Sequence, residues 1–372
     1  MGWEDNVVRY RRDLHRIPEL GFQERQTQAY VMDVLRGLGL EARVVGRTGL
    51  TADISGRSKG PSIAIRADMD GLPIGEETGL PFSSEHPGVM HACGHDGHMA
   101  IVLALAERLV RDRDFRGTVR LLFQPAEELP PGGAVSLIED GVLDGVDAVY
   151  GLHLWANDPV GKVGLRAGPM MANADLFTIR VHGLGGHGSE PEHTKDAVLI
   201  ASQIVVNLQT VVSRRIRAWD PVVVTCGTIQ GGHTFNIIAE TAQITGTVRT
   251  FSKDAQERVM SEIQRIAERT AALYDATVDV EYVKGYPVVM NHEREASAWA
   301  EKLRGLVEVF EPQPAMGGED FAYYLQERPG AFLFLGAGQD QGISPPHHSP
   351  HFLVNERALP IGVDVLWRLL DR

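Results

Sequence analysis

The sequence predicts a protein of the α/β class: a layered α/β domain into which a smaller, ferredoxin-like α+β domain is inserted. The chain of 372 residues is long enough for two domains of typical size. Helix-like and strand-like segments alternate along its first part. The order of these segments changes after residue 172 and changes back near residue 285, which indicates an insertion.

The first part of the chain alternates amphipathic helices with short apolar strands. A helix over 98–111 carries Val102, Leu105 and Leu109 on one face at helical spacing. Alternation of this kind predicts a layered sheet with its chemistry at the carboxyl ends of the strands. The other elements that we expect here are helices over 5–16 and 23–38 and strands over 41–45, 51–54 and 62–66.

Residues 173–284 follow a different order of elements. We expect strand, helix, strand, strand, helix, strand, which is the pattern of a ferredoxin-like fold. The predicted domains are therefore 1–172 and 285–372, which together form the main domain, and 173–284, which is inserted between its two parts. The elements of the insertion are 176–181, 196–217, 222–230, 242–250, 253–272 and 277–282.

Composition excludes several classes of partner. A formal net charge of −13 argues against nucleic acid or an anionic membrane surface. No apolar run reaches the ~18 residues that a membrane span requires, and the first residues lack a secretion signal. Cys93 and Cys226 lie far apart and indicate no disulfide framework. We therefore expect a cytoplasmic protein.

The densest group of chemically active side chains lies over 90–98. This segment, MHACGHDGH, contains one thiol, one carboxylate and three imidazoles within nine residues. Thiolate and neutral imidazole suit zinc and its first-row neighbours, whereas calcium and magnesium take oxygen ligands. The segment alone does not exclude the alternative of a histidine-rich surface loop.

Two carboxylates follow an apolar strand over 119–123. Successive side chains of a strand point in opposite directions, so Glu127 and Glu128 can take separate roles, one on a metal and one holding a proton. Solvated acids are the alternative. Asp68 and Asp70 end another strand. We expect them to orient the metal ligands by hydrogen bonds without binding the metal themselves.

Histidines stand at two further places. His153 lies in an apolar segment over 148–155, where a lone histidine is otherwise read as a satisfied core residue. A proline-bounded loop over 345–351, PPHHSPH, holds His347, His348 and His351 far downstream.

Together these motifs resemble one known family. The chain is similar to the metal-dependent aminoacylases, which include hippurate hydrolase, plant auxin-conjugate hydrolases and bacterial N-acyl-amino-acid amidohydrolases of the carboxypeptidase-G-like metallopeptidase superfamily. The matching stretches keep the family's order and cover nearly the whole chain: RRDLH at 11–15 with PELG at 18–21, RADMDGLP at 66–73, CGHDGH at 93–98, QPAEE at 124–128, GGHG at 185–188 and HSP at 348–350.

The resemblance implies a layered metallohydrolase with a dinuclear centre. The implied reaction is hydrolysis of N-acyl amino acids such as hippurate to a carboxylic acid and a free amino acid. The two divalent ions could be zinc, manganese, cobalt or nickel. His347 and His351 flank His348, so the choice among these histidines rests on the His-Ser-Pro match alone. Carried over by position, the general base is Glu127 and the metal ligands are Cys93, His95, Glu128, His153 and His348.

The inserted domain holds three further candidates. The resemblance implies that Asn236 and Arg249 bind the substrate carboxylate and that His187 stabilises the oxyanion. An arginine fork fits a carboxylate bidentately. A solvated strand arginine and a flexible glycine-rich turn are the alternatives. The resemblance also implies that this domain is a lid and forms a homodimer, with His187 acting in its own or in the partner's site.

Two other functions stay open. A dipeptidase or carboxypeptidase would use the same metals and the same carboxylate clamp, and would differ in whether it accepts a free amino group. A catalytically silent metal-binding protein is the second alternative. Glu127 argues against it, because a structural metal site needs no spare carboxylate.

Overall fold

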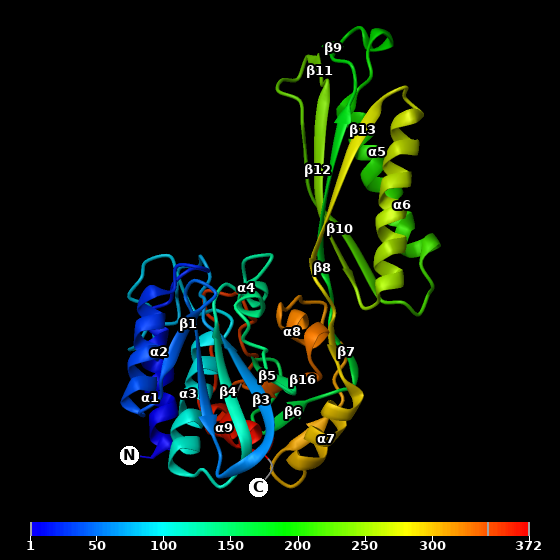
Figure 1. Cartoon of the computed structure of the whole chain (residues 1–372). Coiled ribbons are helices and arrows are strands. Elements are labelled where there is room, and N and C mark those ends of the chain that lie inside the picture. Colours follow the sequence, from blue (N-terminus) through cyan, green and yellow to red (C-terminus); the bar gives the residue numbers. More distant parts are fainter. Residues whose placement is uncertain (1, 341, 371–372) are drawn as a thin grey trace. The chain divides into compact units, whose positions relative to one another are not determined.

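The computed structural model describes residues 2–340 and 342–370. Within this part of the chain, contacts divide the protein into two compact units (Figure 1). Unit 1 consists of the chain up to Met170, Val289–Gln313 and the chain from Asp320 onward. Unit 2 consists of Met171–Val288 together with Pro314–Glu319, a short segment that the expected domain boundaries assign to the main domain.

Unit 1 is built on one eight-stranded mixed sheet. Its strands are β1 (Ala42–Val45), β2 (Gly49–Ser55), β3 (Ser58–Asp68), β4 (Arg116–Gln124), β5 (Ala148–Trp155), β6 (Lys162–Gly164), β15 (Glu308–Phe310) and β16 (Gly330–Gly336), and β7 (Gly168–Met171) pairs separately with β14 (Val289–Asn291). In space the order is β1-β2-β4-β3-β5-β16-β6-β15. The neighbours β4, β3, β5 and β16 are parallel, so their carboxyl ends meet at one edge.

Helices cover this sheet and confirm the predicted layered α/β class. They are α1 (Trp3–His15), α2 (Arg25–Gly37), α3 (His95–Arg111), α4 (Gly133–Glu139), α7 (Glu293–Leu303), α8 (Phe321–Glu327) and α9 (Ala358–Trp367). α3 packs against α1, α9 and β3 and is buried along most of its length. It is the central helix of the unit 1 core.

The predicted start of this central helix at residue 98 is wrong. α3 begins at His95, because Gly94 just before it has φ +97°. Glycine adopts this left-handed conformation without a side-chain clash and so allows an abrupt entry into the helix. His95 and Asp96 consequently belong to the first helical turn.

Asp96 ties this turn to α1 through buried charges. One carboxylate oxygen, Oδ2, accepts hydrogen bonds from Arg11 Nε (2.8 Å) and His15 Nδ1 (2.8 Å). All three side chains are buried. Burial opposes ionisation of Asp96, but Arg11 and His15 outweigh it and hold the pKa of the carboxyl well below its usual range.

Unit 2 has the ferredoxin-like fold that the sequence predicts. Its antiparallel sheet has the order β10-β12-β8-β13, with α5 and α6 contributing to one core. The elements are β8 (Ala174–His182), α5 (Ala197–Thr210), β10 (Val222–Gly231), β12 (Thr241–Thr250), α6 (Lys253–Ala272) and β13 (Thr277–Tyr286), with the short strands β9 (Gly186–His187) and β11 (Ile237–Ile238) paired separately.

The prediction of a single helix over 196–217 is wrong at its end. α5 stops at Thr210, and Val211–Arg215 forms a π-helix. By length and composition, Ala197–Arg215 is also long and apolar enough to cross a membrane, contrary to the expectation that no segment of the chain is. Ile200 and Ile204 of this segment are buried in the core of unit 2, so its apolar face packs against the sheet.

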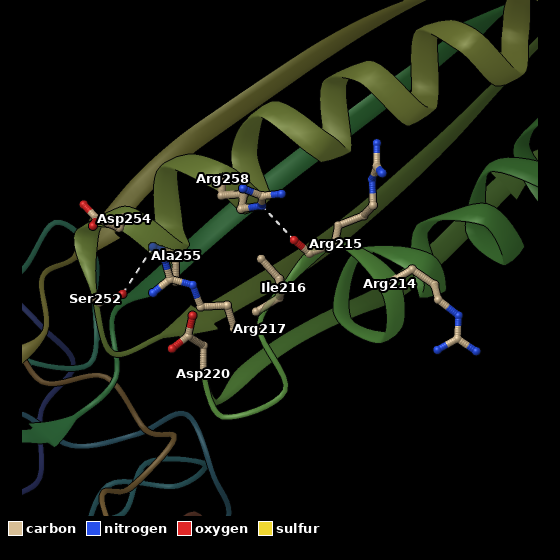
Figure 2. Close-up of a pocket in the computed structure, with 9 residues that line it drawn as sticks. All are labelled: Arg214, Arg215, Ile216, Arg217, Asp220, Ser252, Asp254, Ala255 and Arg258. Atoms are coloured by element: carbon tan, nitrogen blue, oxygen red, sulfur yellow. Dashed lines mark hydrogen bonds between the residues drawn. The ribbon is translucent and has the colours of Figure 1, made fainter.

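A surface pocket of about 540 Å³ lies between the π-helix and the start of α6 (Figure 2). Arg214, Arg215, Arg217 and Arg258 line it. Their side chains point in different directions in Figure 2, and Arg215 Nε donates to Glu262 (3.0 Å). The guanidinium groups therefore do not converge on a common ligand, and none of the predicted site residues lines this pocket.

Asp96→Asn should destabilise the protein strongly. The substitution removes the buried carboxylate that Arg11 and His15 share and leaves Arg11 only Glu356 and His15 only Glu76 as an anionic partner. Breaking a buried ion pair costs about 3–5 kcal/mol of unfolding free energy. Asp364→Asn is the matched control, because Asp364 pairs with Arg108 at a partly exposed position and should cost less than about 1 kcal/mol. Denaturant unfolding of both variants measures the difference, and equal losses would contradict the assignment.

Candidate metal centre

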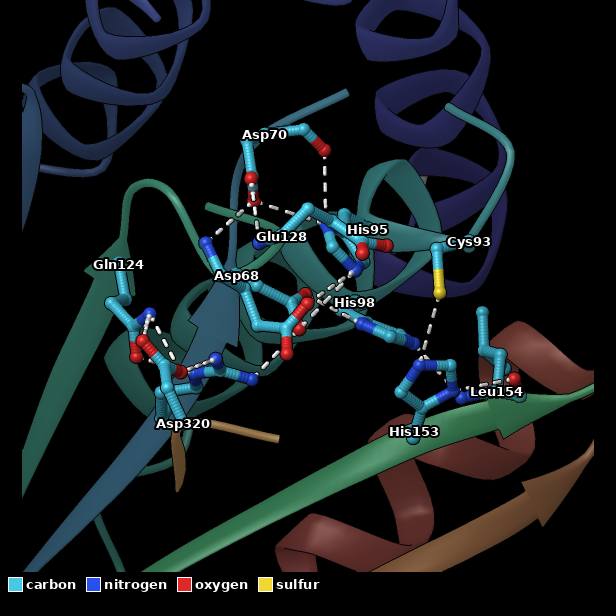
Figure 3. A network of polar contacts seen from close by, with 12 residues as sticks. Asp68, Asp70, Cys93, His95, His98, Gln124, Glu128, His153, Leu154 and Asp320 are labelled. Carbon is cyan, nitrogen blue, oxygen red and sulfur yellow. Dashed lines mark hydrogen bonds and ion pairs between the residues drawn. The ribbon is translucent and has the colours of Figure 1, made fainter. Parts of the chain in front are cut away.

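The candidate centre lies at the carboxyl ends of β3, β4 and β5, in unit 1 (Figure 3). Asp68 ends β3 and pairs in register with Gln124, the last residue of β4. His153 stands near the end of β5. The left-handed turn at Gly94 adds the first turn of α3 to the same edge.

The structure brings the predicted unit 1 ligands together. Their donor atoms form overlapping groups in which all atoms lie within 4.8 Å of one another: Cys93, His95 and His153; Cys93, Glu128 and His348; and His95, Glu127 and Glu128. Cys93, His95 and Glu128 each belong to two of these three groups. Because the Cys93 sulfur belongs to two groups of donors, each group can hold one cation, and two cations can bind side by side.

Backbone carbonyls set the protonation of two of these imidazoles. His95 Nδ1 donates to Asp70 O (2.9 Å), and His153 Nδ1 donates to Leu154 O (2.8 Å). When either ring is neutral, its proton is therefore on Nδ1, and Nε2 presents its lone pair. Nε2 is the atom through which both rings can bind a metal.

The donor set fits a divalent cation. Among the described residues, His95 Nε2 is buried and has no hydrogen-bond partner. The carboxylate oxygens near it, Asp68 Oδ2 and Glu127 Oε2, stand 3.6 Å and 4.0 Å away. Burial lowers the pKa of His95, but Asp68 and Asp70 outweigh it and raise the pKa to about 10. This excess of negative charge favours a cation, and nitrogen with sulfur suits zinc and its first-row neighbours.

The other donors have shifted pKa values of clear origin. Burial raises the pKa of the Cys93 thiol well above its ordinary value, and the nearby Glu128 and Glu127 carboxylates raise it further. The thiol therefore needs a cation to ionise. Burial lowers the pKa of His153, with His98 and His347 lowering it further, so His153 is neutral and ready to bind a metal.

The structure separates the histidines of the 345–351 loop. His348 Nε2 lies 2.9 Å from Glu128 Oε1, and its backbone has φ +63°. His347 Nδ1 also faces Cys93 Sγ, at 3.8 Å, but His347 Nε2 accepts from Ala156 N (3.2 Å), and among the described residues His347 belongs to none of the ligand groups. His351 is exposed, and its ring lies beside Glu77. His348 is thus the member of this loop that joins the ligand groups.

Asp68 and Asp70 support the ligands. Asp70 accepts from the backbone N–H groups of Glu127 (3.0 Å) and Glu128 (3.0 Å). Asp68 accepts a hydrogen bond from Arg66 Nη1 (2.7 Å), so the arginine partly neutralises the negative charge of the Asp68 carboxylate. Both carboxylates therefore hold neighbouring segments in place.

His98 was not identified from the sequence. Its Nδ1 donates to Asp68 Oδ1 (2.6 Å), and its Nε2 accepts from Leu154 N (2.8 Å). Both ring nitrogens are thus occupied, and the ring connects β3 to the backbone beside His153. The spacing of His95 and His98, three residues apart on one helix, is the signal that could have found it.

Arg66 and Asp320 form a second support that the sequence did not reveal. Asp320 is fully buried and accepts from Arg66 Nη2 (2.8 Å), Gln124 Nε2 (2.8 Å) and Ala134 N (3.0 Å). These bonds connect the ends of β3 and β4 to Asp320, which directly precedes α8, and Figure 3 shows Asp320 beside Gln124. The strand ends that carry the site are therefore linked by a closed polar network.

The three predicted residues of the inserted domain lie in unit 2. His187 and Asn236 are neighbours, because His187 in β9 pairs with Ile237 in β11 and Gly188 N donates to Asn236 O (2.9 Å). Both are exposed, and His187 Nδ1 lies 2.7 Å from Ser189 Oγ. Arg249 is half-buried near the end of β12, where burial lowers its pKa and Asp175 raises it.

A family model described as peptidase family M20/M25/M40 matches residues 64–372. The chain belongs to this family. Two relatives match this chain over nearly its whole length. The N-acetyl-L-cysteine deacetylase of Bacillus subtilis is 42% identical over 359 residues, which is 96% of this chain and 85% of the relative. The thermostable carboxypeptidase 1 of Saccharolobus solfataricus is 39% identical over 365 residues, which is 96% of this chain and 93% of the relative.

A solved structure of the family agrees. The Bacillus subtilis YXEP protein, described as a dinuclear metal binding peptidase from the M20 family, matches with a TM-score of 0.87 and 37% identity, covering 99% of this chain and 97% of that chain. This M20/M25/M40 chain is therefore a metal-dependent hydrolase with a dinuclear metal centre. The alternative of a catalytically silent protein has no support.

His98→Ala should weaken metal binding without removing a ligand. Loss of its two hydrogen bonds frees the backbone beside His153, and comparable changes behind metal ligands cost about 10–100-fold in affinity. Chelator competition followed by metal analysis measures this. His182→Ala, an exposed histidine of unit 2, is the control and should not change the affinity. Unchanged affinity in His98→Ala would contradict the supporting role.

Proposed function

We propose that this enzyme hydrolyses the amide bond of N-acyl amino acids to a carboxylic acid and a free amino acid. The observation that carries the proposal is the position of Glu127, whose Oε2 lies 4.0 Å from His95 Nε2 at the edge of the donor cluster. Glu127 is buried beside the ligand groups and follows the end of β4. The similarity to a deacetylase that is named for an N-acyl amino acid supports the same substrate class.

In this proposal the residues divide into ligands and a base. Cys93, His95, Glu128, His153 and His348 hold two divalent cations, with zinc, manganese, cobalt and nickel all compatible with the donors. When bound, the metal ions supply Lewis-acid polarisation of the scissile carbonyl and acidify water. Glu127 takes the proton of the attacking water and returns it to the leaving amine.

The substrate carboxylate is assigned to Arg249 and Asn236. Among the described residues, no carboxylate forms an ion pair with Arg249, although its guanidinium is half-buried. A partly buried arginine whose guanidinium forms no ion pair favours a carboxylate ligand, which its planar fork binds bidentately. Binding at this remote carboxylate positions the amide that reacts. His187 is assigned to the oxyanion as a hydrogen-bond donor.

We further propose that the protein is a cytoplasmic homodimer that takes only small-molecule substrates. Unit 2 would act as lid and dimerisation domain between catalytic segments 1–172 and 285–372. In this arrangement His187 of each subunit enters the active site of the other, and a two-fold axis makes the two contacts equivalent.

A carboxypeptidase or dipeptidase is the second candidate, because a relative carries the name carboxypeptidase. A substrate panel distinguishes the two. Benzoyl-, acetyl- and indole-acetyl-amino acids are compared with dipeptides, with zinc, manganese, cobalt and nickel supplied in turn. Faster hydrolysis of dipeptides than of every N-acyl amino acid would overturn the proposal.

Glu127→Gln and Glu128→Gln should have different effects. Glu127→Gln removes the base and should lower kcat by about 10²–10⁴-fold, with metal content near that of the wild type. Glu128→Gln replaces a ligand and should lose metal as well. Steady-state kinetics with metal analysis tests both. Full metal occupancy in both variants, or an active Glu127→Gln, would refute the assignment.

Arg249→Lys should lower kcat/KM on N-acyl amino acids by about 10-fold or more, because lysine cannot bind a carboxylate bidentately. Substrates amidated at that carboxylate should be poor for the wild type and little changed by the substitution. Kinetics on matched acid and amide substrates measures this. Equal losses on both substrates would make Arg249 a structural residue.

Mixing subunits tests where His187 acts. His187→Ala and Glu127→Gln proteins are each expected to be nearly inactive. If His187 acts in the partner's site, subunit exchange creates heterodimers with one intact site, and activity should rise to roughly a quarter of the wild type. Exchange is monitored with differently tagged subunits. Exchange without recovered activity would show that His187 does not act in the partner's site.

A further inference from the structure

The backbone between β4 and Glu128 is held by two carboxylates from other segments. Three consecutive N–H groups donate to them: Ala126 N to Glu24 Oε1 (2.9 Å), Glu127 N to Asp70 Oδ1 (3.0 Å) and Glu128 N to Asp70 Oδ2 (3.0 Å). Asp70 lies just after the neighbouring strand β3. Glu24, by contrast, precedes α2 and lies about a hundred residues from Ala126 in the chain.

Ala126 needs such a bond because its backbone is strained. It has φ +52°, in the left-handed region that residues other than glycine seldom adopt. Strain of this kind costs about 1–3 kcal/mol and persists only where surrounding contacts enforce it. The next residue is Glu127, so the backbone angles at Ala126 determine the direction in which the Glu127 side chain leaves the backbone after β4.

Glu24 is placed to enforce this conformation. It is completely buried, and its second oxygen accepts from Thr48 Oγ1 (2.5 Å), a buried hydroxyl. Both carboxylate oxygens are therefore engaged in the protein interior. Burial raises the pKa of Glu24 to about 7, against the effect of these hydrogen bonds, which shows how far the group is removed from water.

The loop before Glu24 fits closely against Ala126. A Cβ at Gly21 would lie 3.0 Å from the Cβ of Ala126, so a larger residue would push the two segments apart. Phe22, with φ +62°, turns the loop, and the Arg47 guanidinium lies 4.5 Å from the centre of its ring. The loop over residues 21–24 is thus shaped to bring the Glu24 carboxylate to Ala126 N.

We propose that Glu24 is a positioning residue for the hydrolysis, which acts through the Ala126 backbone to hold the Glu127 carboxylate beside the metal ligands. This inference rests on the proposed role of Glu127 as the base. Glu24 itself touches neither substrate nor metal, because both of its oxygens are bonded to Ala126 and Thr48. The role depends on the geometry of an acceptor and not on its charge.

Two substitutions at Glu24 separate geometry from charge. Glu24→Met has a similar length but no acceptor, and it should lower kcat by about 10–100-fold, as expected for a displaced catalytic group. Glu24→Gln keeps an oxygen for Ala126 N and an amide that can donate to Thr48, so its kcat should stay within about 3-fold of the wild type. KM should change little in both. The lower kcat of Glu24→Met should persist at saturating metal concentration, when metal analysis shows that the centre is fully occupied.

Hydrogen exchange gives a readout that does not depend on turnover. Amides of residues 124–129 should exchange faster in Glu24→Met than in the wild type, and Glu24→Gln should restore their protection. Where Glu24→Met does not fold, Glu24→Asp takes its place, because its shorter carboxylate cannot reach Ala126 N and Thr48 Oγ1 together. Glu19→Gln is the control, since Glu19 accepts from Gln26 N and Thr27 N at the start of α2.

A double variant identifies the residue through which Glu24 acts. In a Glu127→Gln background, Glu24→Met should cause no further loss of kcat, because the group that it positions is already disabled. Independent, multiplicative losses would overturn the inference, and so would wild-type kcat and exchange in Glu24→Met. An active Glu127→Gln would instead refute the base assignment first, and the positioning inference with it.

Discussion

Asp70 is the residue on which the metal centre depends most. Its two carboxylate oxygens accept the N–H groups of Glu127 and Glu128, and its carbonyl oxygen accepts from His95 Nδ1. Hydrogen bonds to a charged group contribute about 1.5–3 kcal/mol each, and two of these three bonds go to the Asp70 carboxylate, so rotating that side chain would lose both. One residue just after β3 thereby sets the spacing between the segment that follows β4 and the first turn of α3.

Much of the architecture could be predicted from the sequence because it depends on periodicity. Alternating segments predicted the layered sheet, and the strand–helix order after residue 172 predicted the ferredoxin-like unit, whose strand order agrees. Boundaries were less predictable. The helix at His95 begins early because of one glycine angle, and α5 changes to a π-helix at Val211, where no residue type marks the change.

The residue types that form the site could be predicted from the sequence, but the hydrogen bonds that hold them in place could not. Clustered histidines, a cysteine and paired carboxylates indicated a metal, and the resemblance supplied the assignments of ligands and base, which stay predictions. The supports could not be seen: His98 is defined by bonds to Asp68 and Leu154 N, and Glu24 by a bond to Ala126 N. Such bonds join residues that are distant in sequence, and no local pattern encodes them.

The donor groups are spread over the whole chain, which has a consequence for biosynthesis. Cys93, His95, Glu128 and His153 precede the inserted unit, whereas His348 follows it. Domains generally fold as units from the N-terminus while the chain is being made. A chain that has emerged only as far as the inserted unit therefore carries every donor but one, and the cluster closes only after the loop with His348 has been made.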